Sequence, residues 1–400
     1  MVNRWGLTVT VAGTPVDLHR IPLPVDISHG RANADSQPDA PTLSMQWAGA
    51  DFPGSMGDPV ELRQALTYGP AVTYDSADIV WDDPGVLWDA GALGDSARFV
   101  GTITQLTPVE EYGAVVSWEV RAVGTAARLG AQPIRLDRPA EPDTARIAAI
   151  AAAAGVAIVT HGDPGPTLAA DAIDRDALAA VHEVAESSAG LFWQAPDGSM
   201  HYGTHSHRAA EPRLVLPAST ILDGIAWTQD TNTITNHVTV KYGEPQAETT
   251  HRDDASIAQA WGNRHADVTT LAADLAAADL LGVLIIDRWA WPRWSAPDVR
   301  LPLDTLPPAD MYTVQNLDVS TSVLVPIPPI PAPTPAPLTK WVVEGWQEHW
   351  AEDGHSMELT LSEFGRYGSQ NVRTWEQAAA ATWADEAAGS WVDALTVEAA

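Results

Sequence analysis

The chain has 400 residues, of which 22 are basic and 52 acidic, and its formal net charge is −30. Nucleic-acid binding needs clustered lysine and arginine, and this balance argues against it. The charge favours a very soluble protein, or one whose surface must not adhere to DNA passing nearby. The sequence contains no cysteine, which excludes disulfides and thiolate metal sites.

A chain of this length with 45% hydrophobic residues can form two or three folded domains. Residues 1–6 are polar, and no apolar stretch of signal-peptide length follows them. No window approaches the roughly 18 uninterrupted apolar residues of a membrane span. We therefore expect neither a signal peptide nor a membrane-spanning segment.

Residues 1–130 contain about six short segments in which apolar and polar residues alternate, a pattern typical of β-strands. The clearest are 99–104 and 116–122, which predict a hairpin with one buried face. Pro108–Gly113 separates them and lacks the Asn-Gly signature of a two-residue turn, so we expect a longer loop. We interpret this hairpin as the closing half of a first β-barrel domain.

The composition changes in residues 131–212, where two helices and a hairpin are expected. Asp143 or Thr144 should cap an alanine-rich helix that Gly155 ends, and Asp174 should cap a second helix that ends at Gly190. A tight-turn sequence, Pro-Asp-Gly at 196–198, then lies between two strand-like segments. These residues predict a small α+β domain inserted between all-β segments.

Residues 213–365 return to strand patterns and predict a second β-barrel domain. It should include a helix from roughly Asp267 to Ile286, whose leucines recur at helical spacing. Residues 326–338 are rich in proline and predict a stiff, extended loop. Trp341–Trp346 and Met357–Leu361 should pair as the last hairpin. The expected fold is therefore a β-rich α+β class with two β-barrels, one inserted domain and a C-terminal extension.

The extension, residues 366–400, contains three tryptophans spaced eight residues apart: Trp375, Trp383 and Trp391. An acidic residue follows each of them within two positions. An even spacing places all three rings on one face of an extended chain, whereas a helix would spread them around its axis. A row of exposed indole side chains is unfavourable for solubility unless another surface covers it. We expect a docking strip for a neighbouring subunit or partner, with a tail folded back on its own chain as the alternative.

Candidate chemistry is sparse. His201, His205 and His207 form the densest group of potential metal ligands, but no carboxylate has the spacing of a zinc protease. We expect solvated loop histidines, no metal and no cofactor. The sequence has no nucleophile elbow, phosphate loop or dinucleotide fingerprint, and acidic pairs are too numerous to single out one as catalytic. We therefore expect no enzymatic activity.

The order of segments resembles a known family. It is carried by the strand FVGTIT at 99–104, the end of the insert AESSAGLFWQAPDG at 185–198, the returning strand ITNHVTV at 234–240 and the closing strand VVEGW at 342–346. This series, and the Trp-acid repeats after it, look like the minor tail proteins of actinobacterial siphophages. The similarity is to those of the baseplate hub or tail-associated hub type, and it covers residues 1 to about 365.

The resemblance implies a homotrimer of paired β-barrels that forms a ring at the tail tip and surrounds a channel for DNA. The implied partners are the distal tail protein ring, the tape-measure protein and other minor tail proteins. The protein would belong to the virion and assemble in the host cytoplasm. Family members often carry C-terminal lysin modules, and we expect no cell-wall hydrolysis from this chain.

Two alternatives stay open. One is a hexameric distal-tail ring protein of the same tail, which copy number would distinguish from the hub. The other is a protein that binds or degrades cell-wall carbohydrate and uses exposed tryptophans as sugar platforms.

Overall fold

The computed structural model describes residues 6–31, 36–65, 95–208, 214–216, 225–243, 245–306, 308–325, 339–352 and 354–363. Within these ranges the chain is β-rich with few helices, as the sequence predicts. The proline-rich loop 326–338 and the tail 366–400, with Trp375, Trp383 and Trp391, lie outside the described residues. No helix in the described ranges is long and apolar enough to cross a membrane.

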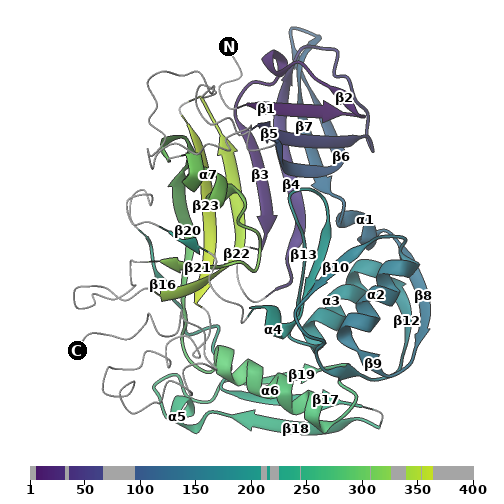
Figure 1. Ribbon diagram of the computed structural model, residues 1–400, viewed down its shortest axis with the longest axis vertical. Helices are drawn as coiled ribbons and strands as arrows, with labels where there is room; N and C mark the ends of the chain where they lie inside the picture. Colours follow the sequence, from purple (N-terminus) through teal and green to yellow (C-terminus); the bar gives the residue numbers. More distant parts are fainter. Residues whose placement is uncertain are drawn as a thin grey trace, which may run out of the picture.

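A 13-stranded sheet dominates the described structure and runs through both halves of the chain (Figure 1). Its strands are β1 (Leu7–Val11), β2 (Thr14–Pro15), β3 (Val25–Gly30), β4 (Asp39–Ala48), β5 (Pro59–Ala65), β6 (Asp95–Glu111), β7 (Ala114–Gly124), β15 (Leu214–Val215), β16 (Thr228–Gln229), β20 (Trp294–Pro302), β21 (Ser322–Val325), β22 (Thr339–Trp350) and β23 (His355–Glu363). The short helices η1 (Leu18–Arg20), η3 (Leu303–Thr305) and α7 (Pro308–Gln315) accompany them.

The strand order is β16-β20-β23-β22-β3-β4-β7-β6-β5-β1-β2, with β21 beside β22 and β15 beside β21. The two halves meet where β22 pairs with β3 in antiparallel register, Trp350 opposite Val25. The two ends of this order do not pair, so the described strands form an open sheet. The arrangement as two barrels stays a prediction.

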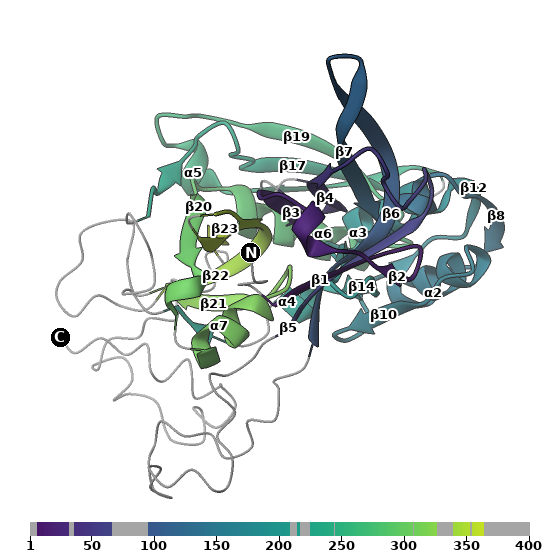
Figure 2. The ribbon, with the colours of Figure 1, turned by 90° about the horizontal axis from the view of Figure 1, so that it is seen from above.

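The hairpin of β6 and β7 projects well beyond the rest of the sheet (Figure 2). Its strands join through Tyr112 and Gly113, whose φ angles are +52° and +80°. Two positive φ angles are typical of a type I′ turn, so the expected longer loop is wrong and Pro108 lies inside β6. The prediction failed because Tyr112, which rarely adopts this conformation, occupies the place of the usual asparagine.

Alternation explains most of the sheet. In β4 the side chains of Leu43, Met45 and Trp47 are buried while their neighbours face outward. In β22 the register against β23 shifts between Val343 and Gly345, which makes Glu344 a β-bulge. Because of this extra residue, Trp341 and Trp346 both enter the core of the sheet although five positions separate them.

The inserted unit contains two packed helices, and its core is separate from that of the large sheet. Its elements are α1 (Ala127–Gly130), β8 (Pro133–Arg138), β9 (Glu141–Pro142), α2 (Asp143–Ala153), β10 (Ile158–His161), β11 (Thr167–Leu168), β12 (Asp171–Asp176), α3 (Ala177–Ser187), β13 (Leu191–Gln194), β14 (Met200–Gly203) and α4 (His205–Arg208). The predicted hairpin is β13–β14. Asp176, and not Asp174, caps α3, because Asp176 Oδ1 accepts from the amide of Ala179 at 2.8 Å while Asp174 belongs to β12.

A third unit lies at the foot of the molecule in Figure 1 and has its own small core. It consists of β17 (His237–Tyr242), β18 (Ala247–Arg252), α5 (Asp254–Ile257), β19 (His265–Thr269) and α6 (Leu275–Trp289). The predicted helix from Asp267 therefore begins too early. Residues 265–269 pair with β17 as a strand, and Asp274 caps α6 by accepting from the amide of Ala277 at 2.9 Å.

Candidate functional site

The histidines singled out from the sequence lie on regular elements, His201 on β14 and His205 and His207 on α4. All three are partly buried, so the expectation of solvated loop histidines is wrong. The rings of His201 and His207 stack on His161 of β10, with centroids 5.1 and 5.0 Å from it. Trp193 of β13 completes the stack, 5.4 Å from His201. His161 was missed because it is 40 residues away in sequence.

Hydrogen bonds run through this ring stack in one direction. The Ser199 hydroxyl donates to Asp197 Oδ1, so His201 Nε2, 2.7 Å away, must donate to Ser199 Oγ. His201 Nδ1 is then the acceptor for His161 Nε2 at 2.8 Å. Burial, together with His161, lowers the pKa of His201. Because the Ser199 proton is directed to Asp197 and not to an imidazole, this geometry does not activate a serine nucleophile. No group of three potential ligands in the described part of the chain is placed to hold a metal ion.

The stack also joins the inserted unit to the large sheet. Trp193 Nε1 donates to Asp318 Oδ2 at 2.8 Å, and Trp193 packs with Leu191 and Val319. Burial raises the pKa of Asp318 to about 6, against the opposing effect of this hydrogen bond. The ring stack therefore connects the inserted unit to the large sheet through the Trp193–Asp318 hydrogen bond.

Two buried ion pairs cross the interior of the large sheet. Arg98 of β6 donates to Glu348 of β22 from Nε at 2.8 Å and Nη2 at 2.6 Å, and both side chains are at most 1% exposed. Arg31 donates from Nε to the bulge residue Glu344 at 2.8 Å. These pairs link the first half of the chain to the last strands. Composition could not reveal them, because a buried arginine has the same sequence signature as an exposed one.

The charge of Arg98 shifts the pKa values of the titratable groups around it. Its guanidinium lies 5.1 Å from the ring centroid of Trp346, on which His29 stacks at 4.2 Å. Burial, with the nearby charge of Arg98, lowers the pKa of His29 to about 3. Burial alone would raise the pKa of Glu348, but Arg98 and the hydrogen bond from His355 hold it below its ordinary value. We call this buried cluster of Arg98, Glu348, Trp346, His29 and His355 the buried clamp, because it ties β6 to β22.

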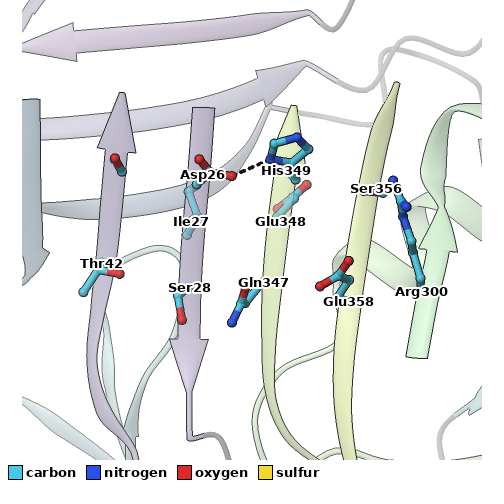
Figure 3. Close-up of a pocket in the computed structure, with 11 residues that line it drawn as sticks. Asp26, Ile27, Ser28, Thr42, Arg300, Gln347, Glu348, His349, Ser356 and Glu358 are labelled. Atoms are coloured by element: carbon cyan, nitrogen blue, oxygen red, sulfur yellow. Dashed lines mark hydrogen bonds and ion pairs between the residues drawn. The ribbon is translucent and has the colours of Figure 1, made fainter. Parts of the chain in front are cut away.

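The opposite face of the sheet has a polar hollow of about 400 Å³ (Figure 3). Cross-strand pairing arranges its side chains in two rows over both halves of the chain: Ser44, Asp26, His349 and Ser356 in one row, and Thr42, Ser28, Gln347, Glu358 and Arg300 in the next. His349 Nδ1 and Asp26 Oδ1 form a hydrogen bond. The hollow mixes both signs of charge, and its lining contains no tryptophan, tyrosine or phenylalanine. It is a polar sheet surface rather than an apolar ligand pocket.

The sequence matches no protein-family model and no curated protein. Solved structures share its fold. A tail protein from Neisseria meningitidis MC58 has a TM-score of 0.60 at 14% identity, with 90% of this chain and 96% of that chain covered. The 43 kDa tail protein of prophage MuSo2 from Shewanella oneidensis has a TM-score of 0.60 at 11% identity, with coverages of 90% and 98%.

A third structure is from Escherichia coli, with a TM-score of 0.50 at 9% identity and coverages of 89% and 76%. That protein is described as a component of the type VI secretion system that is structurally similar to the T4 tail proteins gp27 and gp5. The similarity spans the large sheet and the smaller units together, since 90% of this chain is matched in the two tail proteins. The chain therefore has the fold of phage tail proteins.

Proposed function

We propose that the protein is a structural component of a phage tail, the hub at the distal end that joins the tail tube to the tip. The observation that carries this proposal is the shared fold, which covers 90% of this chain and 96% and 98% of two tail proteins. In this proposal three copies, each contributing two barrel-like halves, close a ring. The ring would contact the distal tail protein, the tape-measure protein and other minor tail proteins, at the tail tip of the virion.

The polar rows of the large sheet are the surface best suited to line the channel of such a ring. They cross both halves of the chain, and their charges include Asp26 and Glu358 as well as Arg300. A face of mixed charge on a protein of net charge −30 has little affinity for phosphate, so DNA could pass without binding. A channel face dominated by lysine and arginine would contradict this assignment.

The proposed role is structural and not enzymatic. The side chains of Arg98 and Glu348 are buried and paired with each other, and the histidine stack directs its serine proton to a carboxylate. Tryptophan, tyrosine and phenylalanine are absent from the lining of the polar hollow, which disfavours sugar stacking there. The polar hollow therefore gives no support to the cell-wall alternative.

Copy number tests the proposal most directly. Quantitative mass spectrometry of purified virions, together with antibody labelling seen by electron microscopy, should find three copies at the tail tip. Six copies would reject the hub in favour of the hexameric ring protein. Release of soluble sugar or peptide from cell walls by the purified chain would overturn the structural role.

A further inference from the structure

Where α6 ends, the residues Arg288, Trp289, Trp291, Arg293 and Trp294 form what we call the tryptophan–arginine patch. The guanidinium carbons of Arg288 and Arg293 lie 5.0 and 5.4 Å from the ring centroid of Trp289. All five side chains are partly exposed, unlike the core residue Trp341. A cation on an indole face presents both an aromatic surface and a positive charge to a ligand.

Neighbouring side chains fix this surface. Trp291 Nε1 donates to Asp253 Oδ2 at 2.8 Å, which holds its ring. Arg288 Nη2 donates to Oε1 of the buried Glu344 at 3.5 Å. The patch offers indole surface with two arginines, on a molecule whose overall charge is −30. Such a surface fits a segment that carries both aromatic rings and carboxylates.

The chain itself has a segment with that chemistry. Residues 374–400 contain the three spaced tryptophans and no lysine or arginine. Their carboxylates are Glu376, Asp385, Glu386, Asp393 and Glu398. The last described residue, Glu363, accepts a hydrogen bond on Oε2 from the amide of Trp294 at 3.3 Å. The chain therefore leaves the described structure beside the patch.

Distance favours the segment of the same molecule over that of a second copy. Trp375 follows Glu363 by 12 residues, 375 minus 363, which reach at most about 40 Å when fully extended. A tether of this length gives an effective concentration of about millimolar, so weak contacts suffice for binding. We propose that residues 374–393 dock on the tryptophan–arginine patch of their own chain, with indoles against its rings and carboxylates near its arginines.

Chymotrypsin cleavage of the full-length protein tests this proposal, because the enzyme cuts after exposed tryptophan. Mass spectrometry would follow cleavage at 375, 383 and 391. Arg293→Glu should speed cleavage by about fivefold or more, and about 0.5 M NaCl should speed it in the unaltered protein. The matched control is Arg135→Glu, because the Arg135 side chain is 84% exposed on the inserted unit. That variant should be cleaved at the rate of the unaltered protein.

A second variant places the change in the segment and leaves the folded body intact. Lysine substitutions E376K, D385K and D393K together should also speed cleavage, and adding Arg293→Glu to them should restore part of the protection. Equal cleavage rates in Arg293→Glu and Arg135→Glu would overturn the proposal. It would also be overturned if the unaltered protein were cleaved at these tryptophans as fast as the variant with the three lysines. Protection that increases with protein concentration would assign the occupant to a second copy and reject docking within one chain.

Discussion

The large sheet and the unit formed by β17, β18, β19 and α6 differ in what fills their interiors. The sheet buries the charged pairs Arg98–Glu348 and Arg31–Glu344 between strands far apart in sequence. The smaller unit is filled by short apolar residues contributed by neighbouring elements: Val238, Val240, Ala272, Ala277, Ala278 and Leu281.

The difference has a physical consequence. Apolar packing tolerates many partners of similar size, whereas a buried charge requires one complementary partner in one position. We therefore expect the Arg98–Glu348 pair to favour one arrangement of β6 and β22, which are not neighbours in the strand order. The small unit, whose strands and helix are close in sequence, has no need of such selection. This contrast predicts where a single substitution does the most damage.

The largest effect should come from Arg98→Met. It leaves Glu348 buried without its arginine and should lower the free energy of unfolding by about 3–5 kcal/mol. Chemical denaturation measures this loss. The double variant Arg98→Met/Glu348→Gln should recover part of it, because no unpaired charge remains. Arg135→Met, in an exposed pair with Asp174, is the control. A small loss in Arg98→Met would show that the clamp does not specify the sheet.

The next largest effect is a loss of folding stability at acidic pH. The pKa of His29 is about 3 in the fold against 6.5 in the unfolded chain, so below about pH 6.5 only the unfolded state takes up this proton. Stability from His29 is lost as the pH falls from 6.5 towards 3, by up to a few kcal/mol. Asp318, with a raised pKa of about 6, acts in the opposite direction between pH 6 and 3.8.

His29→Phe isolates the first contribution, because the ring can still stack on Trp346 while Asp318 is unchanged. Thermal unfolding at pH 7 and pH 4.5 should show a smaller loss of stability on acidification for this variant than for the unaltered protein. Equal losses in both proteins would mean that His29 does not titrate on unfolding.

In the small unit, Gly282→Ala should give a smaller effect whose sign depends on one neighbour. Helix propensity favours alanine by about 1 kcal/mol. However, the new Cβ would lie 2.2 Å from His251 Cδ2, so we expect a net loss of about 1–3 kcal/mol. In a His251→Ala background the same change should stabilise. Denaturation of the four proteins as a cycle measures the coupling, and a loss of the same size in both backgrounds would contradict it.

The smallest expected effect lies in the large sheet but far from its charged interior. Tyr112 is fully exposed and adopts a φ of +52°, which asparagine tolerates better. Tyr112→Asn should therefore stabilise the protein by about 0.5 kcal/mol. A shift of the thermal midpoint to higher temperature would support this, and a lower midpoint would indicate that the tyrosine ring makes contacts on the hairpin.

Local patterns predicted much of the fold. The alternation in β4 and the β13–β14 hairpin around Pro-Asp-Gly follow from short-range chemistry. The predicted cap of α2 at Asp143 or Thr144 is wrong, because Pro142 is the N-cap without a side-chain cap hydrogen bond and Asp143 is the first residue of the helix. Such features depend on residues a few positions apart, which a single sequence displays directly.

Long-range features could not be predicted in this way. The bulge residue Glu344 accepts a hydrogen bond from Arg31, 313 residues earlier, and no local pattern indicates that contact. The ring stack requires His161 to meet His201, 40 positions later, whereas proximity in sequence groups only His201, His205 and His207. The choice between Asp174 and Asp176 as a cap depended on the pairing of β12 with β8. The predicted docking role of Trp375, Trp383 and Trp391 remains a proposal.

The pairing of β3 with β22 sets a condition on synthesis. Val25–Gly30 finds its partner in Gly345–Trp350, more than 300 residues later. Until the ribosome has made β22, the nascent chain carries β3 with one open edge, and such an edge invites misassembly. A product that terminates before β22 would keep the unpaired edge of β3 and lack the continuous sheet. β3 can be paired on this edge only after residues 345–350 have been synthesised, so a chain that stops before them cannot form the continuous sheet.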